Sequence, residues 1–179
     1  MIIIEGADGV GKTTFCRKLC DVFVAQMGST AAGWYSHMSR PAENFDHVTG
    51  YMRAVRAGVQ DRFHLGSIAY GKLLGSGTYP TPRKMAIVQR YLEWQGCCVV
   101  VLRAERDWLK RELLARPDLD KEMYQLDQIL DVNDAFTALA NSHNRGNSWA
   151  HSMIDVTDGW PGEEDATRIF NVWKARWQR

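Results

Sequence analysis

A glycine-rich segment near the N-terminus has the residue types and the spacing needed to bind phosphate groups. Residues 6–13 read Gly-Ala-Asp-Gly-Val-Gly-Lys-Thr, which satisfies the pattern G-x-x-x-x-G-K-[ST]. An apolar β-branched run at residues 2–4 precedes the segment and a helical pattern of apolar residues follows it, as this pattern requires. A chance glycine-rich turn would have to reproduce both the motif and this frame, so the segment predicts a phosphate-binding loop.

Each residue type in this loop has a physical role in binding ATP and Mg²⁺. Glycines allow consecutive backbone N–H groups to point at phosphate oxygens, and the N-terminus of the following helix adds its positive end. Lys12 reaches the outer phosphates, and the Thr13 hydroxyl ligates Mg²⁺. The predicted ATP-phosphate site comprises Gly6, Ala7, Asp8, Gly9, Val10, Gly11, Lys12, Thr13 and Thr14.

The loop alone does not separate kinases, GTPases and ATPases, so other segments must decide. After the loop the sequence contains neither a D-x-x-G segment nor an N-K-x-D string, both of which a switch GTPase carries. The strand predicted at residues 97–102 is followed by Arg103, whereas an AAA-type or helicase motor needs carboxylates there. These features favour a small-molecule or group-transfer kinase.

A second motif stands where a third strand is predicted to end. Residues 61–70 read Asp-Arg-Phe-His-Leu-Gly-Ser-Ile-Ala-Tyr. An Asp at a strand end beside a phosphate loop can hold Mg²⁺ through a water, and an adjacent Arg can neutralise charge between the transferring and accepting phosphates. Lys12, Asp61 and Arg62 are therefore the first candidates for catalytic residues, with Asp61 also a candidate metal ligand; a surface ion pair is the alternative for Asp61 and Arg62.

Together the two motifs resemble the thymidylate kinase branch of the nucleotide kinases, whose pattern is roughly EGxDGxGKTT followed by DR(Y/F)xxSxxAY. The segment DRFHLG followed by YG is similar to that of short thymidylate-kinase-like proteins of bacteriophages. The resemblance implies that Tyr70 packs under the sugar and that Ser67 touches the base, and it gives Asp8 and Phe63 places at the substrate. Packing roles are the alternative for Ser67 and Tyr70.

The resemblance also implies a helical lid that supplies cations, because this phosphate loop contains no Arg. We place the lid at about residues 106–122, with Arg111 and Arg116 as catalytic candidates and Lys121 beside them. Closing such cations over ATP would exclude water from the transfer. A solvated helix face is the alternative for each of the three residues.

The acceptor side departs from the family pattern. Residues 39–41 (Ser-Arg-Pro) match only part of the family's (T/S)REP segment, which makes Arg40 a candidate for binding the acceptor phosphate. Family members then carry helices that shape the thymine pocket, and here the interval from Pro41 to Asp61 is too short to hold all of it. The identity of the base therefore stays open at this point.

Strands and helices alternate along the chain. Short apolar runs predict strands at residues 1–5, 33–37, 59–61, 97–102 and 149–156. Helical spacing predicts a helix after the loop, one from Thr81-Pro82 to Gly96, and others at 45–58, 65–74, 105–115, 121–140 and 163–177. This order predicts a three-layer α/β P-loop kinase fold in one domain over residues 1–179: a central parallel sheet of about five strands, helices on both faces and a helical lid.

Composition excludes several other classes of protein. The 179 residues include 22 Lys and Arg and 21 Asp and Glu, an ordinary globular balance that argues against disorder. We expect a cytoplasmic protein with no membrane partner, because no apolar run suits a transmembrane helix or a signal peptide. The four cysteines fit no zinc pattern and are expected to be reduced and buried. The first 90 residues carry 11 basic and 6 acidic side chains, so this half should face an anionic partner.

Three hypotheses for function follow from these observations. In the first, ATP with Mg²⁺ donates its γ-phosphoryl group to a pyrimidine deoxynucleotide, as in a nucleoside monophosphate kinase. In the second, the acceptor is the hydroxyl of a nucleoside or of a hydroxymethylated pyrimidine such as 5-hydroxymethyluracil within DNA, with Asp61 or Asp8 as general base and the basic half along the DNA backbone. In the third, the protein binds nucleotides but is catalytically inert, which the intact Lys12, Thr13, Asp61 and Arg62 argue against. Thymidylate kinases are often dimers, so the resemblance also implies a homodimer.

Overall fold

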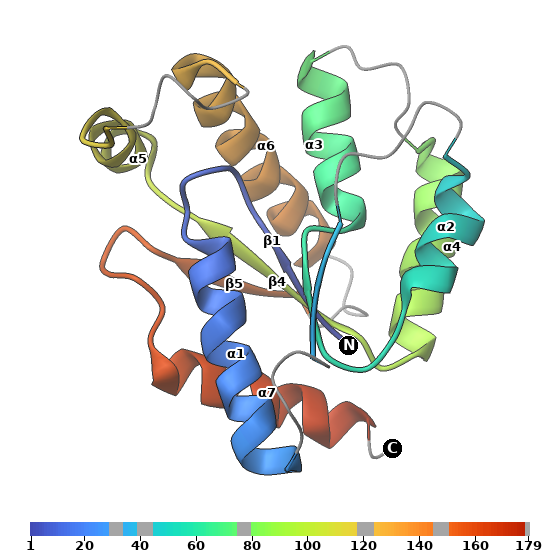
Figure 1. The fold of residues 1–179 in the computed structure, drawn as a ribbon. Coiled ribbons are helices and arrows are strands. Elements are labelled where there is room, and N and C mark those ends of the chain that lie inside the picture. The colour runs from blue at the N-terminus through green and yellow to red at the C-terminus, as the bar shows by residue number, and fades with distance from the viewer. Residues whose placement is uncertain (29–33, 39–44, 75–79, 118–123, 145–150, 178–179) are drawn as a thin grey trace.

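The computed structural model describes residues 1–28, 34–38, 45–74, 80–117, 124–144 and 151–177. Within these residues five strands form one parallel sheet in the order β2-β3-β1-β4-β5 (Figure 1). The strands are β1 (Ile2–Glu5), β2 (Tyr35–His37), β3 (Val59–Asp61), β4 (Cys98–Arg103) and β5 (His151–Asp155). The predicted parallel sheet of about five strands is confirmed.

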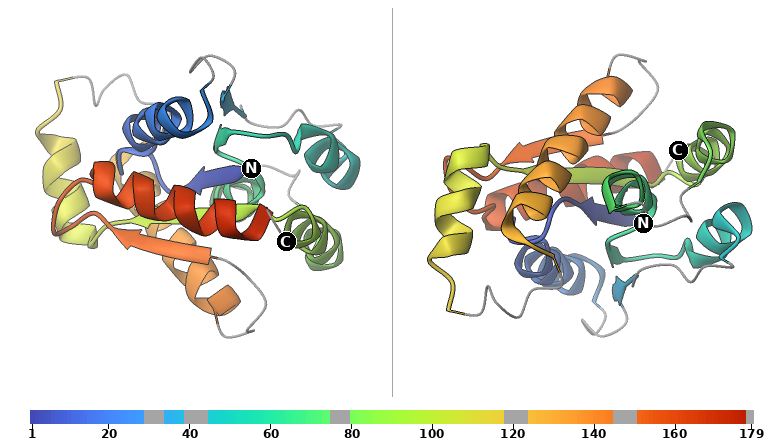
Figure 2. Two further views of the ribbon diagram at one scale, coloured as in Figure 1. Left: turned by 90° about the horizontal axis from the view of Figure 1, so that it is seen from below. Right: turned by 90° about the horizontal axis from the view of Figure 1, so that it is seen from above.

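Helices cover both faces of this sheet. They are α1 (Lys12–Met27), α2 (His47–Ala54), α3 (His64–Leu74), α4 (Pro82–Trp94), α5 (Arg106–Leu114), α6 (Leu126–Asn144) and α7 (Glu163–Trp177). Helix α1 packs against α7 and helix α3 against α6. Figure 2 shows α7 in front of the sheet when the molecule is seen from below, and α3 and α6 in front of it when seen from above, so the two pairs lie on opposite faces.

Helix α2 is shorter than the predicted helix at residues 45–58. It begins at His47 because Asp46 caps it, its Oδ1 accepting a hydrogen bond of 3.1 Å from the backbone N–H of Val48. After Ala54 the backbone of Val55 is extended, and the chain turns toward β3 at Gly58, which has a φ of +113°. A Cβ at Gly58 would lie 2.4 Å from the carbonyl oxygen of Trp34, so this close approach requires glycine.

Helix α6 differs from the prediction at both ends. It begins at Leu126 instead of residue 121, and the side chain of Gln128 accepts a 3.0 Å hydrogen bond from the N–H of Gln125 just before this start. At its other end the helix continues to Asn144, whereas the predicted helix ended at residue 140. The buried side chain of Ala140 holds the last turns against the core, so packing overrides the weak helix propensity of the residues that follow.

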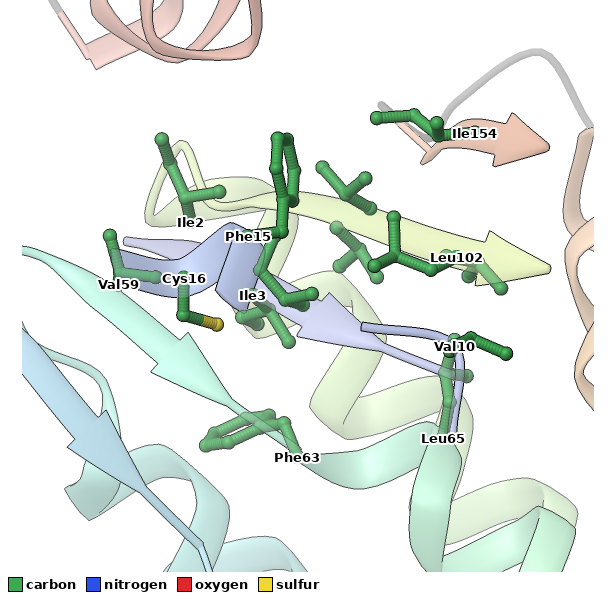
Figure 3. Packing of buried hydrophobic residues seen from close by; sticks show 14 of the residues in the cluster. Ile2, Ile3, Val10, Phe15, Cys16, Val59, Phe63, Leu65, Leu102 and Ile154 are labelled. Carbon is green, nitrogen blue, oxygen red and sulfur yellow. The ribbon is translucent and has the colours of Figure 1, made fainter. Parts of the chain in front are cut away.

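The core lies between the sheet and the two helix layers. Figure 3 shows side chains from the central strands meeting Phe15 and Cys16 of α1 on one side and Leu65 of α3 farther along. Ile2, Ile3 and Ile4 are completely buried, as expected for a strand covered on both faces. The four cysteines are also buried, as the sequence predicted.

The remaining helix predictions agree with the structure within one or two residues. Thr81 caps α4 as predicted, its Oγ1 accepting a 3.3 Å hydrogen bond from the N–H of Lys84, and Pro82 occupies the first helical position. Among the described helices, none combines the length and the apolar character needed to cross a membrane.

Candidate functional site

The phosphate loop joins the carboxyl end of β1 to the N-terminus of α1 (Figure 1). Gly6, Gly9 and Gly11 have φ angles of +146°, +88° and +79°, which L-residues rarely adopt. A Cβ at Gly6 would also lie 2.5 Å from the carbonyl oxygen of Leu102 in the neighbouring strand β4. The glycines of the motif are therefore required by the path of the backbone.

Lys12 lies inside this loop and its side chain is 5% exposed. Its Nζ donates to the carbonyl oxygen of Ala7 and lies 3.5 Å from Oδ1 of Asp8. Burial lowers the pKa of Lys12, while the charge of Asp8 opposes this effect. The cation of the loop is thus paired with a carboxylate of the same loop.

Asp61 stands at the end of β3, beside the start of α1. Its Oδ2 accepts hydrogen bonds from Thr13 Oγ1 at 2.8 Å and from the Tyr35 hydroxyl at 3.1 Å. Burial and the charge of Asp61 raise the pKa of Tyr35 to about 12. The other carboxylate oxygen, Oδ1, is buried and has no hydrogen-bond partner among the described residues.

The donor set at Thr13 and Asp61 fits Mg²⁺. Hydroxyl and carboxylate oxygens are ligands that Mg²⁺ prefers, and the unpartnered Oδ1 of Asp61 is the orphaned acceptor that a cation would satisfy. In the described part of the chain, no three His, Cys, Asp or Glu side chains form a metal-binding cluster.

Arg62 and Tyr70 both reach Asp8 from the far side of the loop. Arg62 forms an ion pair with Oδ1 of Asp8, and the Tyr70 hydroxyl donates a 3.0 Å hydrogen bond to Oδ2. The guanidinium of Arg62 also lies 5.9 Å from the centre of the Tyr70 ring, a cation–π contact. Burial alone would raise the pKa of Asp8, but Lys12 and Arg62 hold it below its usual range. The structure thus brings Asp8, Lys12, Arg62 and Tyr70 together.

Of the predicted lid cations, Arg116 touches the phosphate loop. Its Nη2 donates a 2.9 Å hydrogen bond to the carbonyl oxygen of Gly9. Leu113 of α5 packs on the same glycine, since a Cβ there would lie 2.6 Å from its Cδ2. Arg111, on the same helix, is exposed to solvent. Lys121, and Arg40 on the acceptor side, lie outside the described residues.

The two residues expected near the acceptor base are largely buried. Phe63 is 2% exposed and packs on the ring of Tyr51 with centroids 4.8 Å apart. Ser67 is 9% exposed, and its hydroxyl shares a short hydrogen bond with the hydroxyl of the fully buried Tyr51. Sequence reasoning missed Tyr51, because its place on α2 gives no sign that it reaches α3.

Sequence reasoning also missed the aromatic side chain beside the loop. The ring of Trp160 lies against Gly11, where a Cβ would come within 2.8 Å of it. Trp160 is 45% exposed and makes an edge contact with Trp108 of α5, with ring centroids 5.2 Å apart.

A further missed residue is Glu5, which the family motif contains and which is completely buried next to the loop. The motif itself was the signal that could have drawn attention to Glu5.

Comparisons with known proteins agree with this fold. No protein-family model matches the chain, and no curated protein sequence matches it. Among solved structures, the YorR protein of Bacillus subtilis, crystallised in complex with phosphorylated GDP, matches over 99% of this chain and 98% of its own, with 17% identity and a TM-score of 0.69. A deoxyadenosine kinase from M. mycoides with bound dATP matches over 95% and 96% of the two chains, with 10% identity and a TM-score of 0.44. The likeness to YorR extends over essentially the whole chain, and it confirms the three-layer α/β architecture with a central parallel sheet that was predicted from the sequence.

Proposed function

We propose that the protein is an ATP- and Mg²⁺-dependent kinase that phosphorylates a nucleoside monophosphate, with a pyrimidine deoxynucleotide as its substrate. The observation that carries this proposal is the meeting of Lys12, Arg62 and Tyr70 at Asp8, directly beside the Thr13–Asp61 pair. One cation belongs to the phosphate loop and the other to the turn after β3. This spacing suits a donor phosphate on one side of Asp8 and an acceptor on the other.

On the donor side, the loop binds the phosphates of ATP through its backbone N–H groups and Lys12. Entry of the phosphates draws Lys12 away from Asp8 and Ala7, because a phosphate carries more charge than either partner. Arg116 already lies over Gly9 and would extend this positive surface from the lid at residues 106–122. Trp160 offers its exposed ring next to Gly11 for contact with the rest of the nucleotide.

At the metal site, Thr13 and Asp61 would hold Mg²⁺ directly or through water. Bound there, Mg²⁺ would neutralise the outer phosphate oxygens as the γ-phosphoryl group moves. Tyr35 fixes the carboxylate of Asp61 by its 3.1 Å hydrogen bond to Oδ2, which would leave the unpartnered Oδ1 available to the cation.

On the acceptor side, Arg62 binds the phosphate of the monophosphate and Asp8 and Tyr70 contact its sugar. The bond between the γ-phosphorus and the β,γ-bridging oxygen of ATP breaks, and a bond from the γ-phosphorus to an acceptor phosphate oxygen forms. No general base is needed, because that acceptor oxygen is already ionised. Lys12, Arg62 and Arg116 neutralise the charge that is shared among the oxygens during transfer.

A specific feature of α4 favours a second acceptor, a hydroxyl on a modified pyrimidine within DNA. Arg83, Ile87, Arg90 and Trp94 recur along one side of the helix and are all exposed, Trp94 at 78%. Tyr91 adds a second ring 5.9 Å from that of Trp94. Guanidinium groups interspersed with one aliphatic and two aromatic side chains suit the phosphates and bases of a single nucleic-acid strand.

The decisive experiment measures ADP release from ATP with Mg²⁺ against a panel of acceptors. The panel contains dTMP, dUMP, other nucleoside monophosphates, thymidine, and DNA with and without hydroxymethylated pyrimidines. Turnover with a pyrimidine deoxynucleotide supports the proposal, and turnover with modified DNA alone replaces it by the second acceptor. If no acceptor supports turnover but ATP quenches the fluorescence of the wild type more than that of Trp160→Phe, the protein binds nucleotides without transfer.

A further inference from the structure

Glu5, the last residue of β1, is completely buried directly before the phosphate loop. Its Oε1 accepts a 2.8 Å hydrogen bond from the backbone N–H of Leu65. Its Oε2 lies 3.4 Å from the position of a Cβ on Gly66 and has no hydrogen-bond partner among the described residues, and the backbone N–H groups of Phe63 and Gly66 lower the pKa of the carboxyl. The side chain of Glu5 is thus directed at the backbone where α3 begins.

This contact stabilises the N-terminus of helix α3, which begins at His64. The first N–H groups of a helix have no partner within the helix, and a carboxylate at that end is favoured by the helix dipole. Glu5 supplies such a carboxylate from a different element of the fold. A buried negative charge with no such partners would be strongly unfavourable, so the N–H groups and the carboxylate require each other.

The turn between β3 and α3 is held to β1 at a second point. Arg62 has a φ of +64°, an unusual conformation for a residue other than glycine, and its N–H donates a 3.0 Å hydrogen bond to the carbonyl oxygen of Ile4. Gln60 supports the same turn by donating to the carbonyl oxygen of Arg62 at 3.0 Å. A strained conformation of this kind persists only where its surroundings hold it.

We propose that Glu5 is a positioning residue for phosphoryl transfer. Its carboxylate ties the turn that carries Asp61 and Arg62 to the strand that carries the phosphate loop, and this sets the position of Arg62 relative to Lys12. The inference rests on the proposed function and deepens it. Glu5 is not a catalytic residue, because it is fully buried and its Oε1 holds a backbone N–H group.

The charge of Glu5 makes this connection dependent on pH. Burial raises the pKa of Glu5 to about 7, against the opposing effects of the N–H groups and of Lys12. Three other charged or titratable side chains interact electrostatically with Glu5. They are Arg62, Tyr51 and His64, and Nδ1 of His64 lies 4.0 Å from Oε1 of Glu5. The ionised carboxylate accepts hydrogen bonds from the N–H groups of the turn. The protonated carboxyl carries an O–H donor, and the N–H groups around it cannot accept a hydrogen bond from that donor. Lowering the pH through 7 therefore weakens the contact with the turn.

The first test compares the wild type with Glu5→Gln between pH 6 and 8, with the exposed Glu93→Gln as the control. Glu5→Gln should lower kcat at pH 8 by about 10- to 100-fold, the effect expected of small misplacements of reacting groups. Its KM for ATP should stay within about threefold of that of the wild type, because the loop still carries Lys12. The wild type and Glu93→Gln should lose kcat as the pH falls through 7, and Glu5→Gln should not. A wild-type kcat and an unchanged pH profile in Glu5→Gln would overturn the proposal.

A second test uses the wild type alone and needs neither turnover nor a stable variant. The backbone amide resonances of Phe63, Leu65 and Gly66 in an NMR titration should move together with a midpoint near 7, and that of Arg62 should follow. If these amides do not share a midpoint, Glu5 does not control the turn and the proposal fails. If they do share it while no acceptor in the panel is phosphorylated, the proposed function fails and the structural role of Glu5 stands.

Discussion

The phosphate loop and the adjoining face of α3 present their polar groups in different ways. In the loop, the groups that would meet a ligand belong to one short segment, and Lys12 is paired with Asp8 only four residues away. Phe63, just before α3, and Ser67 on α3 are buried, and Ser67 shares a hydrogen bond with Tyr51 of α2. Under the proposed function, phosphate recognition would therefore depend on local backbone geometry, whereas recognition of the acceptor would depend on how separate helices pack.

This difference predicts that substitutions in the phosphate loop reduce kcat more than substitutions elsewhere in the candidate site. Lys12→Ala should reduce kcat by roughly 10³-fold or more, because the principal cation for the transferring phosphates is lost. The free energy of unfolding should change little or rise, since a buried ammonium is removed. Rates of ADP release and a urea denaturation curve measure the two effects. The matched control is Lys174→Ala on α7, and equal rates for Lys12→Ala and the wild type would favour the inert nucleotide-binding protein.

Asp61→Asn should have the next largest effect. Asparagine keeps an acceptor for Thr13 and Tyr35 but removes the charge that would hold Mg²⁺, so kcat should fall by about 10²-fold. The concentration of Mg²⁺ that gives half-maximal activity should rise. A titration with MgCl₂ at saturating ATP measures this shift. Asp155→Asn is the control, because Asp155 also stands at a strand end beside an arginine, and a shift as large in this variant would remove the metal role of Asp61.

The segment proposed as a lid offers a matched pair of arginines. Arg116→Ala should lower kcat by about 10- to 100-fold, since Arg116 lies against the loop at Gly9. Arg111→Ala should change it by less than about threefold, because its side chain is in solvent. Single-turnover rates with ATP separate the effect on transfer from that on product release. A larger loss in Arg111→Ala would mean that the lid rotates when nucleotide binds.

Much of the fold, including the strand, loop and helix of the phosphate-loop motif, could be predicted from the sequence, because the signals are local. The motif at residues 6–13 specifies a strand, a turn of glycines and a helix, and the Thr81-Pro82 pair marks the start of α4 through its own hydrogen bond. The end of α2 and the last turns of α6 could not be predicted. They depend on contacts with distant residues, such as the carbonyl oxygen of Trp34 at Gly58.

The contacts across the candidate site were harder to predict for the same reason. Asp61 and Thr13 lie 48 positions apart in the sequence, and only the pairing of β1 with β3 brings them together. Family resemblance pointed to Asp61, but nothing in the sequence places Tyr35 on its carboxylate or Trp160 on Gly11. Residues that reach a site from neighbouring strands and loops carry no motif of their own.

Ser67→Ala should give the smallest effect on turnover and a clear effect on stability. Removing the hydroxyl leaves the buried Tyr51 hydroxyl without this partner, which should lower the free energy of unfolding by about 1–3 kcal/mol. If Ser67 touches the base, as the family resemblance implies, the KM for the acceptor should rise a few-fold with kcat unchanged, because Ser67 takes no part in phosphate chemistry. Tyr51→Phe supplies the control, since it removes the same hydrogen bond but keeps the serine hydroxyl, and its KM should match that of the wild type. A Ser67→Ala variant that loses stability but keeps its KM for the acceptor would show that Ser67 has only a packing role. The base of the acceptor would then have to be recognised by residues on other elements.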